Sequence, residues 1–139
     1  MSDLQKKQVM GAEEVLTQVF QTFKTGNLKA LVDLLAEDMV MEFPFAPPGR
    51  PRRVEGKENI IAYNKEVMSI SKGTDYTDLE VYQTTDPNCI IVEMTGHGTV
   101  TATGNPFERR YIDVFRTENG HIKFVRDYWN PQESPTIKG

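Results

Sequence analysis

The 139-residue chain has one cysteine and only two histidines, and both shortages limit its chemistry. A single thiol, Cys89, cannot form an intrachain disulfide or supply the paired cysteines of a structural zinc site. His97 stands alone between two glycines, and His121 lies at a turn, so clustered metal ligands are missing. We therefore expect no metal and no other cofactor.

Long apolar segments and an excess of positive charge are also missing. No stretch is long enough to span a bilayer, and the polar residues 1–7 exclude a signal peptide on sequence grounds. The sequence thus predicts a cytoplasmic protein with no membrane partner. Its 16 basic and 20 acidic residues give a net charge of −4, which disfavours nucleic acid as a partner.

What is present is the composition of an ordinary globular protein, with 38% hydrophobic and 26% charged residues. The length allows one hydrophobic core but not two. Because no repeat, low-complexity tract or linker interrupts the chain, residues 1–139 are predicted to form a single domain.

Helical patterns fill the first half of the chain, and strand patterns fill the second. Apolar residues at helical spacing begin the chain, Gly26 provides a helix stop, and Asn27 is a good N-cap for the next helix. This order predicts an α+β fold. The predicted helices lie near residues 12–24, 28–35 and 57–73, and the predicted strands near 39–43, 79–84, 90–103, 107–116 and 121–129, with a proline-rich loop at 45–53.

The last two strands are predicted to form a hairpin whose loop is residues 118–120, with Gly120 in the left-handed position. Thr117 then pairs with His121. Counting outward from that pair places Asp113 opposite Val125, Tyr111 opposite Asp127 and Arg109 opposite Trp129, all on one face. The other face is predicted to present Ile112, Val114, Ile122 and Phe124.

The first of these faces combines carboxyl groups with aromatic side chains. In the predicted register Asp113 and Asp127 are diagonal neighbours, about 7–8 Å apart. With Phe115, Tyr111 and Trp129, this face carries too many aromatic rings to be fully exposed to solvent. A partly enclosed cavity would accommodate both the rings and the carboxyl groups. Two carboxylates in low dielectric cannot both ionise freely, so one pKa should be raised. The alternative is that both aspartates are surface residues paired with Arg109 and Arg126.

Several segments resemble one superfamily, the nuclear transport factor 2-like proteins. Residues 111–116, 119–122 and 127–129 resemble the terminal hairpin of ketosteroid isomerases and SnoaL-like polyketide cyclases. Residues 41–49 and 55–58 are similar to SnoaL-like proteins, and residues 86–131 resemble the phenazine-biosynthesis A/B proteins. The resemblance implies a cone-shaped fold in which a curved sheet wraps against three helices around a cavity, usually as a homodimer.

The resemblance also implies roles for individual residues. Asp113 matches the neutral aspartic acid of the isomerase oxyanion hole, and Trp129 matches an aromatic wall residue. Asp127 matches the acidic catalytic position of the phenazine A/B proteins and the water-activating aspartate of limonene epoxide hydrolases.

Some positions depart from these relatives. Phe43 stands where the isomerases place their general base, and Val19 replaces their first-helix tyrosine, so steroid isomerisation is disfavoured. Arg110 and Asp113 have the wrong spacing for the epoxide hydrolases. The resemblance to the phenazine A/B proteins fits better than the resemblance to the isomerases or to the epoxide hydrolases.

The sequence therefore predicts an isomerase- or cyclase-like enzyme acting on a small hydrophobic or carbonyl-containing molecule. Asp127 would exchange protons, while a protonated Asp113 and Tyr111 stabilise negative charge. The predicted ligand-binding residues are Trp129, Val125, Phe115, Tyr63 and Arg109, although Tyr63 fits a packing role equally well. Arg50, Arg52 and Arg53 are expected to be solvated, Glu42 to be structural, and His97 to face solvent or a partner subunit. A non-catalytic binding protein with the same pocket is the alternative, ahead of a protein-interaction module.

Overall fold

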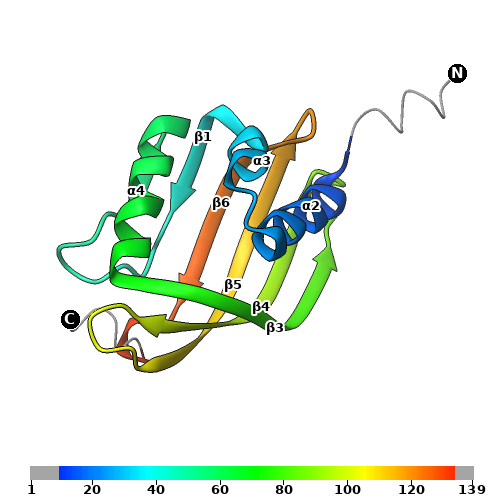
Figure 1. The fold of residues 1–139 in the computed structure, drawn as a ribbon. Coiled ribbons are helices and arrows are strands. Elements are labelled where there is room, and N and C mark those ends of the chain that lie inside the picture. Colours follow the sequence, from blue (N-terminus) through cyan, green and yellow to red (C-terminus); the bar gives the residue numbers. More distant parts are fainter. Residues whose placement is uncertain (1–9, 134–139) are drawn as a thin grey trace, which may run out of the picture.

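The computed structural model describes residues 10–133, in which a curved sheet is covered by helices on one face (Figure 1). The predicted α+β fold, with three helices against a curved sheet, is confirmed. The elements, in chain order, are α2 (Ala12–Thr25), α3 (Leu28–Asp33), β1 (Leu35–Glu42), β2 (Arg53–Glu55), α4 (Lys57–Ile70), β3 (Ser71–Gln83), β4 (Cys89–Val100), β5 (Pro106–Glu118), β6 (His121–Trp129) and the 3₁₀ turn η1 (Pro131–Glu133).

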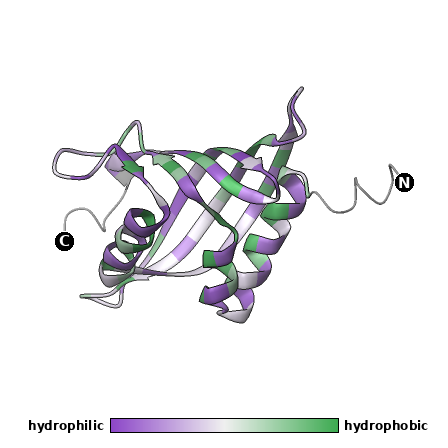
Figure 2. Cartoon of the chain, turned by 90° about the horizontal axis from the view of Figure 1, so that it is seen from above, coloured by the Kyte–Doolittle hydropathy of each residue, from purple (hydrophilic) through white to green (hydrophobic). Residues whose placement is uncertain are grey.

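The six strands follow the spatial order β2-β1-β6-β5-β4-β3. Strands β1 and β6 are parallel, and the other neighbours are antiparallel. Figure 2 shows α2 and α4 on the same side of the sheet, toward opposite ends, with the concave face between them. Among residues 10–133, no helix is long and apolar enough to cross a membrane.

Local sequence signals account for the two N-terminal helices. Gly26 ends α2 in a left-handed conformation at φ 69°, where a side chain would be strained. The Asn27 side chain then accepts a hydrogen bond of 3.1 Å from the Ala30 amide and begins α3. The predicted second helix is shorter than expected, because residues from Leu35 onward join the sheet instead.

The hydrophobic core lies between α2 and the concave face of the sheet. Ile60, Ile90 and Val15 have no accessible surface, and Val92 has almost none. Alternate residues of β4 supply one wall of this core, from Ile90 and Val92 to Met94. Met94, at the end of this row, also lines a cavity.

The hairpin between β5 and β6 differs from the predicted one in its turn. Asn119 and Gly120 have φ values of 52° and 76°, so they form a two-residue turn, and Glu118 rather than Thr117 pairs with His121. Asn-Gly is the commonest sequence for a turn with two positive φ values. The prediction of a three-residue loop was therefore wrong.

A bulge in β6 further changes the register. Thr117 pairs with Ile122 but Arg116 pairs with Phe124, which leaves Lys123 as an extra residue. Ile122 consequently turns to the concave side and is 4% exposed, whereas the sequence placed it on the opposite face.

Beyond this bulge the two aspartates are direct neighbours rather than diagonal ones. Asp113 pairs with Asp127, Phe115 with Val125, and Tyr111 with Trp129. Directly opposite residues have Cβ atoms about 4.5–5.5 Å apart, so the carboxyl groups are closer together than the sequence predicted.

Candidate functional site

A cavity of about 570 Å³ opens between α4, the loop after β1 and the concave face of the sheet. Its volume is within the range of small-molecule sites, about 300–1,000 Å³. The aromatic part of its wall comes from five elements or loops, and comprises Phe43, Tyr63, Tyr76, Tyr111 and Trp129. The polar groups that reach it are Arg50, Asn64, Ser71, Arg109, Asp113 and Asp127.

The two aspartates lie side by side within this aromatic wall. Atom Oδ1 of each carboxyl group has almost no accessible surface and no hydrogen-bond partner among the described residues. The indole Nε1 of Trp129 is in the same state. Unpaired buried polar atoms are costly, and a polar ligand in the cavity would reduce that cost.

Burial prevents both carboxyl groups from ionising together. It raises the pKa of Asp113 well above the usual range, and the adjacent Asp127 carboxyl raises it further. Burial also raises the pKa of Asp127, although a hydrogen bond from Asp113 and the charge of Arg109 oppose this rise. Of the two groups, Asp113 therefore holds a proton more tightly, and Asp127 ionises first.

Arg109 extends along the same face of β5 and lies over aromatic rings. Its guanidinium carbon is 5.5 Å from the ring centre of Trp129 and 5.8 Å from that of Tyr111. Each of these rings is two residues from an aspartate on the same strand face. A positive charge at this place favours the ionised form of the neighbouring Asp127.

The phenols in the wall stay protonated at neutral pH. Burial raises the pKa of Tyr111 to about 12, with Arg109 acting in the opposite direction. Burial likewise raises the pKa of Tyr63, opposed by Arg50. Both hydroxyl groups can therefore donate hydrogen bonds to a negatively charged oxygen.

The structure brings six of the eight predicted site residues into this cavity: Asp113, Asp127, Tyr111, Trp129, Tyr63 and Arg109. The other two, Val125 and Phe115, are 8% and 5% exposed and pack in the core instead. Both side chains do point to the concave face, but helix α2 covers that part of the sheet.

Tyr76 and Arg50 are among the cavity residues that the sequence analysis did not predict. Tyr76 lies in a stretch that was placed before the start of a strand, and its contribution depends on an irregularity of β3. Arg50 was expected to be solvated. Its guanidinium instead lies 5.8 Å from the ring centre of Tyr63 and forms a 3.2 Å ion pair with Glu66 of α4. The proximity of a proline-rich loop to α4 has no local sequence signal.

The remaining singled-out residues lie outside the cavity. His97 projects from the other face of β4, where its Nε2 is 2.7 Å from Thr77 Oγ1. Arg126 binds Glu42 at 3.0 Å rather than an aspartate, so the surface ion-pair alternative for Asp127 is wrong. Glu42 also binds Arg53, as a structural role requires. Within residues 10–133, no group of three or more His, Cys, Asp or Glu side chains could hold a metal ion.

Comparisons with known proteins agree with this architecture. A family model described as a SnoaL-like domain matches residues 16–125. An uncharacterised PhzA/B-like protein of Pseudomonas aeruginosa is 37% identical over 125 residues, 88% of this chain and 86% of that protein. The phenazine biosynthesis protein PhzA2 of the same species is 30% identical over 88 residues, 61% of this chain and 54% of that protein.

The solved structures include a Bacillus subtilis protein provisionally described as an isomerase. It is 37% identical, has a TM-score of 0.78, and the match covers 87% of each chain. The resemblance to SnoaL-like and phenazine A/B proteins is therefore confirmed for sequence and fold together.

Proposed function

Because the chain belongs to the SnoaL-like domain family, we propose that it is a small-molecule enzyme performing acid/base chemistry on a carbonyl compound in this cavity. The carrying observation is that Asp113 and Asp127 lie directly opposite one another inside an aromatic wall. A carboxylate next to a carboxylic acid provides a proton acceptor and a hydrogen-bond donor in the same place.

In the proposed reaction, the Asp127 carboxylate removes a proton from the carbon beside the carbonyl group. The C–H electron pair forms the new C=C bond of an enolate, and the carbonyl π electrons move to oxygen. The protonated Asp113 and the Tyr111 hydroxyl donate hydrogen bonds to that oxygen, and one such donor contributes about 10²–10³-fold in rate. Where a further C=C bond is conjugated with the enolate, returning the proton to the far carbon of that system completes an isomerisation. Attack of the enolate carbon on a second carbonyl group forms a C–C bond and an alkoxide, which takes the proton back from Asp127, and this gives cyclisation or condensation.

The aromatic wall supports this chemistry by limiting water near the carboxyl pair. Phe43 lies against Tyr63, with ring centres 5.0 Å apart, and meets Trp129 edge-on at 5.9 Å. Phe43 is only 2% exposed. A low-dielectric wall of this kind strengthens hydrogen bonds to a developing charge.

Proton abstraction can be tested without knowing the natural substrate. In D₂O, the protein should accelerate exchange of the α-protons of 1-tetralone, a cyclic ketone, as followed by proton NMR. We expect the acceleration to saturate with ketone concentration and to be inhibited by 1-naphthol, a stable hydroxyarene resembling the enol. A rate no greater than that of buffer would contradict the proposal for this class of ketone.

A non-catalytic binding protein is the second candidate, because the unpaired polar atoms of Asp113, Asp127 and Trp129 would suit a bound polar ligand equally well. Binding of 1-naphthol without any proton exchange would favour it. So would ordinary pKa values for both aspartates in a carboxyl-resolved NMR titration.

We also propose that the protein acts in the cytoplasm as a homodimer. The helices cover only the concave face of the sheet (Figure 1), and Ile112 on the other face is 40% exposed. Sedimentation equilibrium should therefore give twice the 15.8 kDa chain mass. A single species at the chain mass, over micromolar to millimolar concentrations, would contradict the dimer.

A further inference from the structure

Tyr76 reaches the cavity because β3 contains an irregularity. Tyr76 pairs with Gly96, and Val81 pairs with Val92, so five residues of β3 span the same distance as four residues of β4. The extra residue lies within the register shift between Thr77 and Glu80, where Asp78 has a φ of 54°. This bulge lets Tyr76 and Val81 both face the concave side despite their odd separation.

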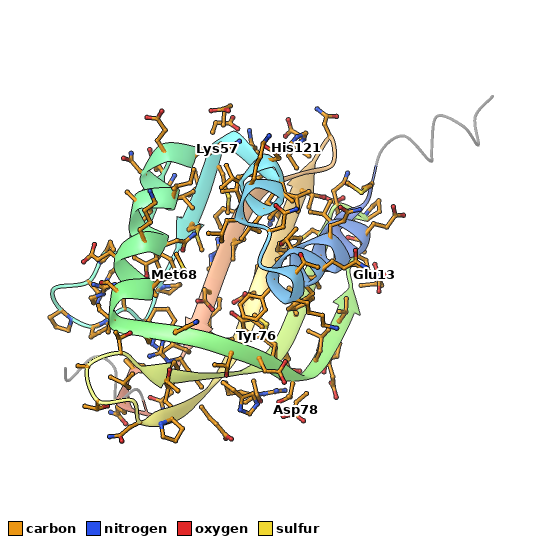
Figure 3. The ribbon with its side chains drawn as sticks, viewed as in Figure 1. Glu13, Lys57, Met68, Tyr76, Asp78 and His121 are labelled. Carbon is orange, nitrogen blue, oxygen red and sulfur yellow. The ribbon has the colours of Figure 1, made fainter. Side chains whose placement is uncertain are left out.

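The ring of Tyr76 lies between the cavity and α2. Figure 3 shows it pointing from β3 into the interior, whereas Asp78 lies on the outer side of the same strand. The Tyr76 ring meets Phe23 edge-on with centres 5.2 Å apart, and Phe20 at 5.8 Å. These two rings of α2 hold Tyr76 from the side away from the cavity.

Glycine at position 96 makes room for this arrangement. A Cβ atom there would lie 2.8 Å from Cε2 of Tyr111 and 3.4 Å from Cε1 of Tyr76. The first separation is shorter than real Cβ contacts allow. Gly96 thus lets two tyrosine rings from different strands close over one part of the sheet.

Tyr76 is 36% exposed, and it lines the cavity. Burial raises the pKa of this phenol, and the charges of Asp127 and Asp113 raise it further. Tyr76 thus lines the same cavity as the two carboxyl groups, and its ring contacts α2.

We infer that Tyr76 is a specificity-determining residue, whose ring closes the cavity beside the carboxyl pair and thereby limits the size of the compounds that the site accepts. This inference rests on the proposed function, since it takes the same cavity as the ligand site. The class of ligand it favours is a compact hydroxyarene or enolisable ketone, because a larger fused-ring compound would meet Tyr76 and the α2 phenylalanines behind it.

The test is a size series of hydroxyarenes, phenol, 1-naphthol, 9-phenanthrol and 1-hydroxypyrene, with affinities measured by titration calorimetry. Tyr76→Ala should shift the best-bound compound toward more rings, with affinity for 1-hydroxypyrene relative to 1-naphthol rising about tenfold. Tyr76→Trp should shift the preference toward fewer rings, and it tests the same wall if the alanine variant fails to fold. Tyr76→Phe should keep the wild-type profile, because it retains the ring.

Tyr82 provides a matched control on the same strand. Its hydroxyl donates to Glu93 at 2.7 Å on the outer face, so Tyr82→Ala removes the same volume away from the cavity. Its size profile should equal that of the wild type. If Tyr76→Ala and Tyr76→Trp both bind the series with the wild-type profile, the role of Tyr76 is refuted while the proposed function stands. If the wild-type protein binds none of the four compounds, the role of Tyr76 and the proposed function are both refuted.

Discussion

Asp127→Asn is expected to reduce the rate of α-proton exchange by about 10²–10⁴-fold, because an amide cannot accept the proton that the carboxylate removes. Asparagine has nearly the same shape as aspartate and removes a charge from a buried place, so the fold should be retained. Binding of 1-naphthol should persist, since Trp129 and the other walls are unchanged. Exchange rates by NMR and binding by calorimetry, on one protein sample, separate these two effects.

A matched control is available in Asp38, an exposed aspartate of β1 that binds Lys123 outside the cavity. Asp38→Asn removes the same charge and should leave the exchange rate within a factor of about two of the wild type. Full activity of Asp127→Asn on a ketone that the wild-type protein deprotonates would assign the base to another residue.

Asp113→Asn is expected to stabilise the protein at pH 8 and to have little effect near pH 4. The folded state holds the Asp113 proton more tightly than the unfolded chain does, because burial raises the pKa of this carboxyl well above 3.8. The unfolded chain therefore loses its proton first as the pH rises. The stability of the wild-type protein falls from about the unfolded pKa upward, until the folded pKa is passed. An amide does not titrate, and it can still donate a hydrogen bond to Asp127.

The expected gain for Asp113→Asn at pH 8 is on the order of 1–3 kcal/mol in the free energy of unfolding. Urea denaturation at a series of pH values would measure it, and the difference from wild type should grow with pH. A difference that is constant from pH 4 to pH 8 would show that Asp113 titrates normally in the folded state. The same result would remove the acid–carboxylate pair from the proposed mechanism.

Local sequence signals predicted much of this fold because they act over a few neighbouring residues. The helical period of α2, the left-handed Gly26 and the N-cap Asn27 each depend on one turn of chain. Strand alternation is equally local. It was enough to place Asp113, Asp127, Tyr111 and Trp129 on one face, although the register between their strands was wrong.

The sequence by itself determined that two carboxyl groups and several aromatic rings share one face of the closing hairpin. Tertiary structure decided what that face does. The two-residue turn and the Lys123 bulge set the aspartates directly opposite one another, the Asp78 bulge turned Tyr76 inward, and helix α2 covered Phe115 and Val125. Strand register depends on pairing, and the covering of the sheet by a helix depends on packing, between segments distant in the chain. The spacing of residues within one segment does not encode either of them.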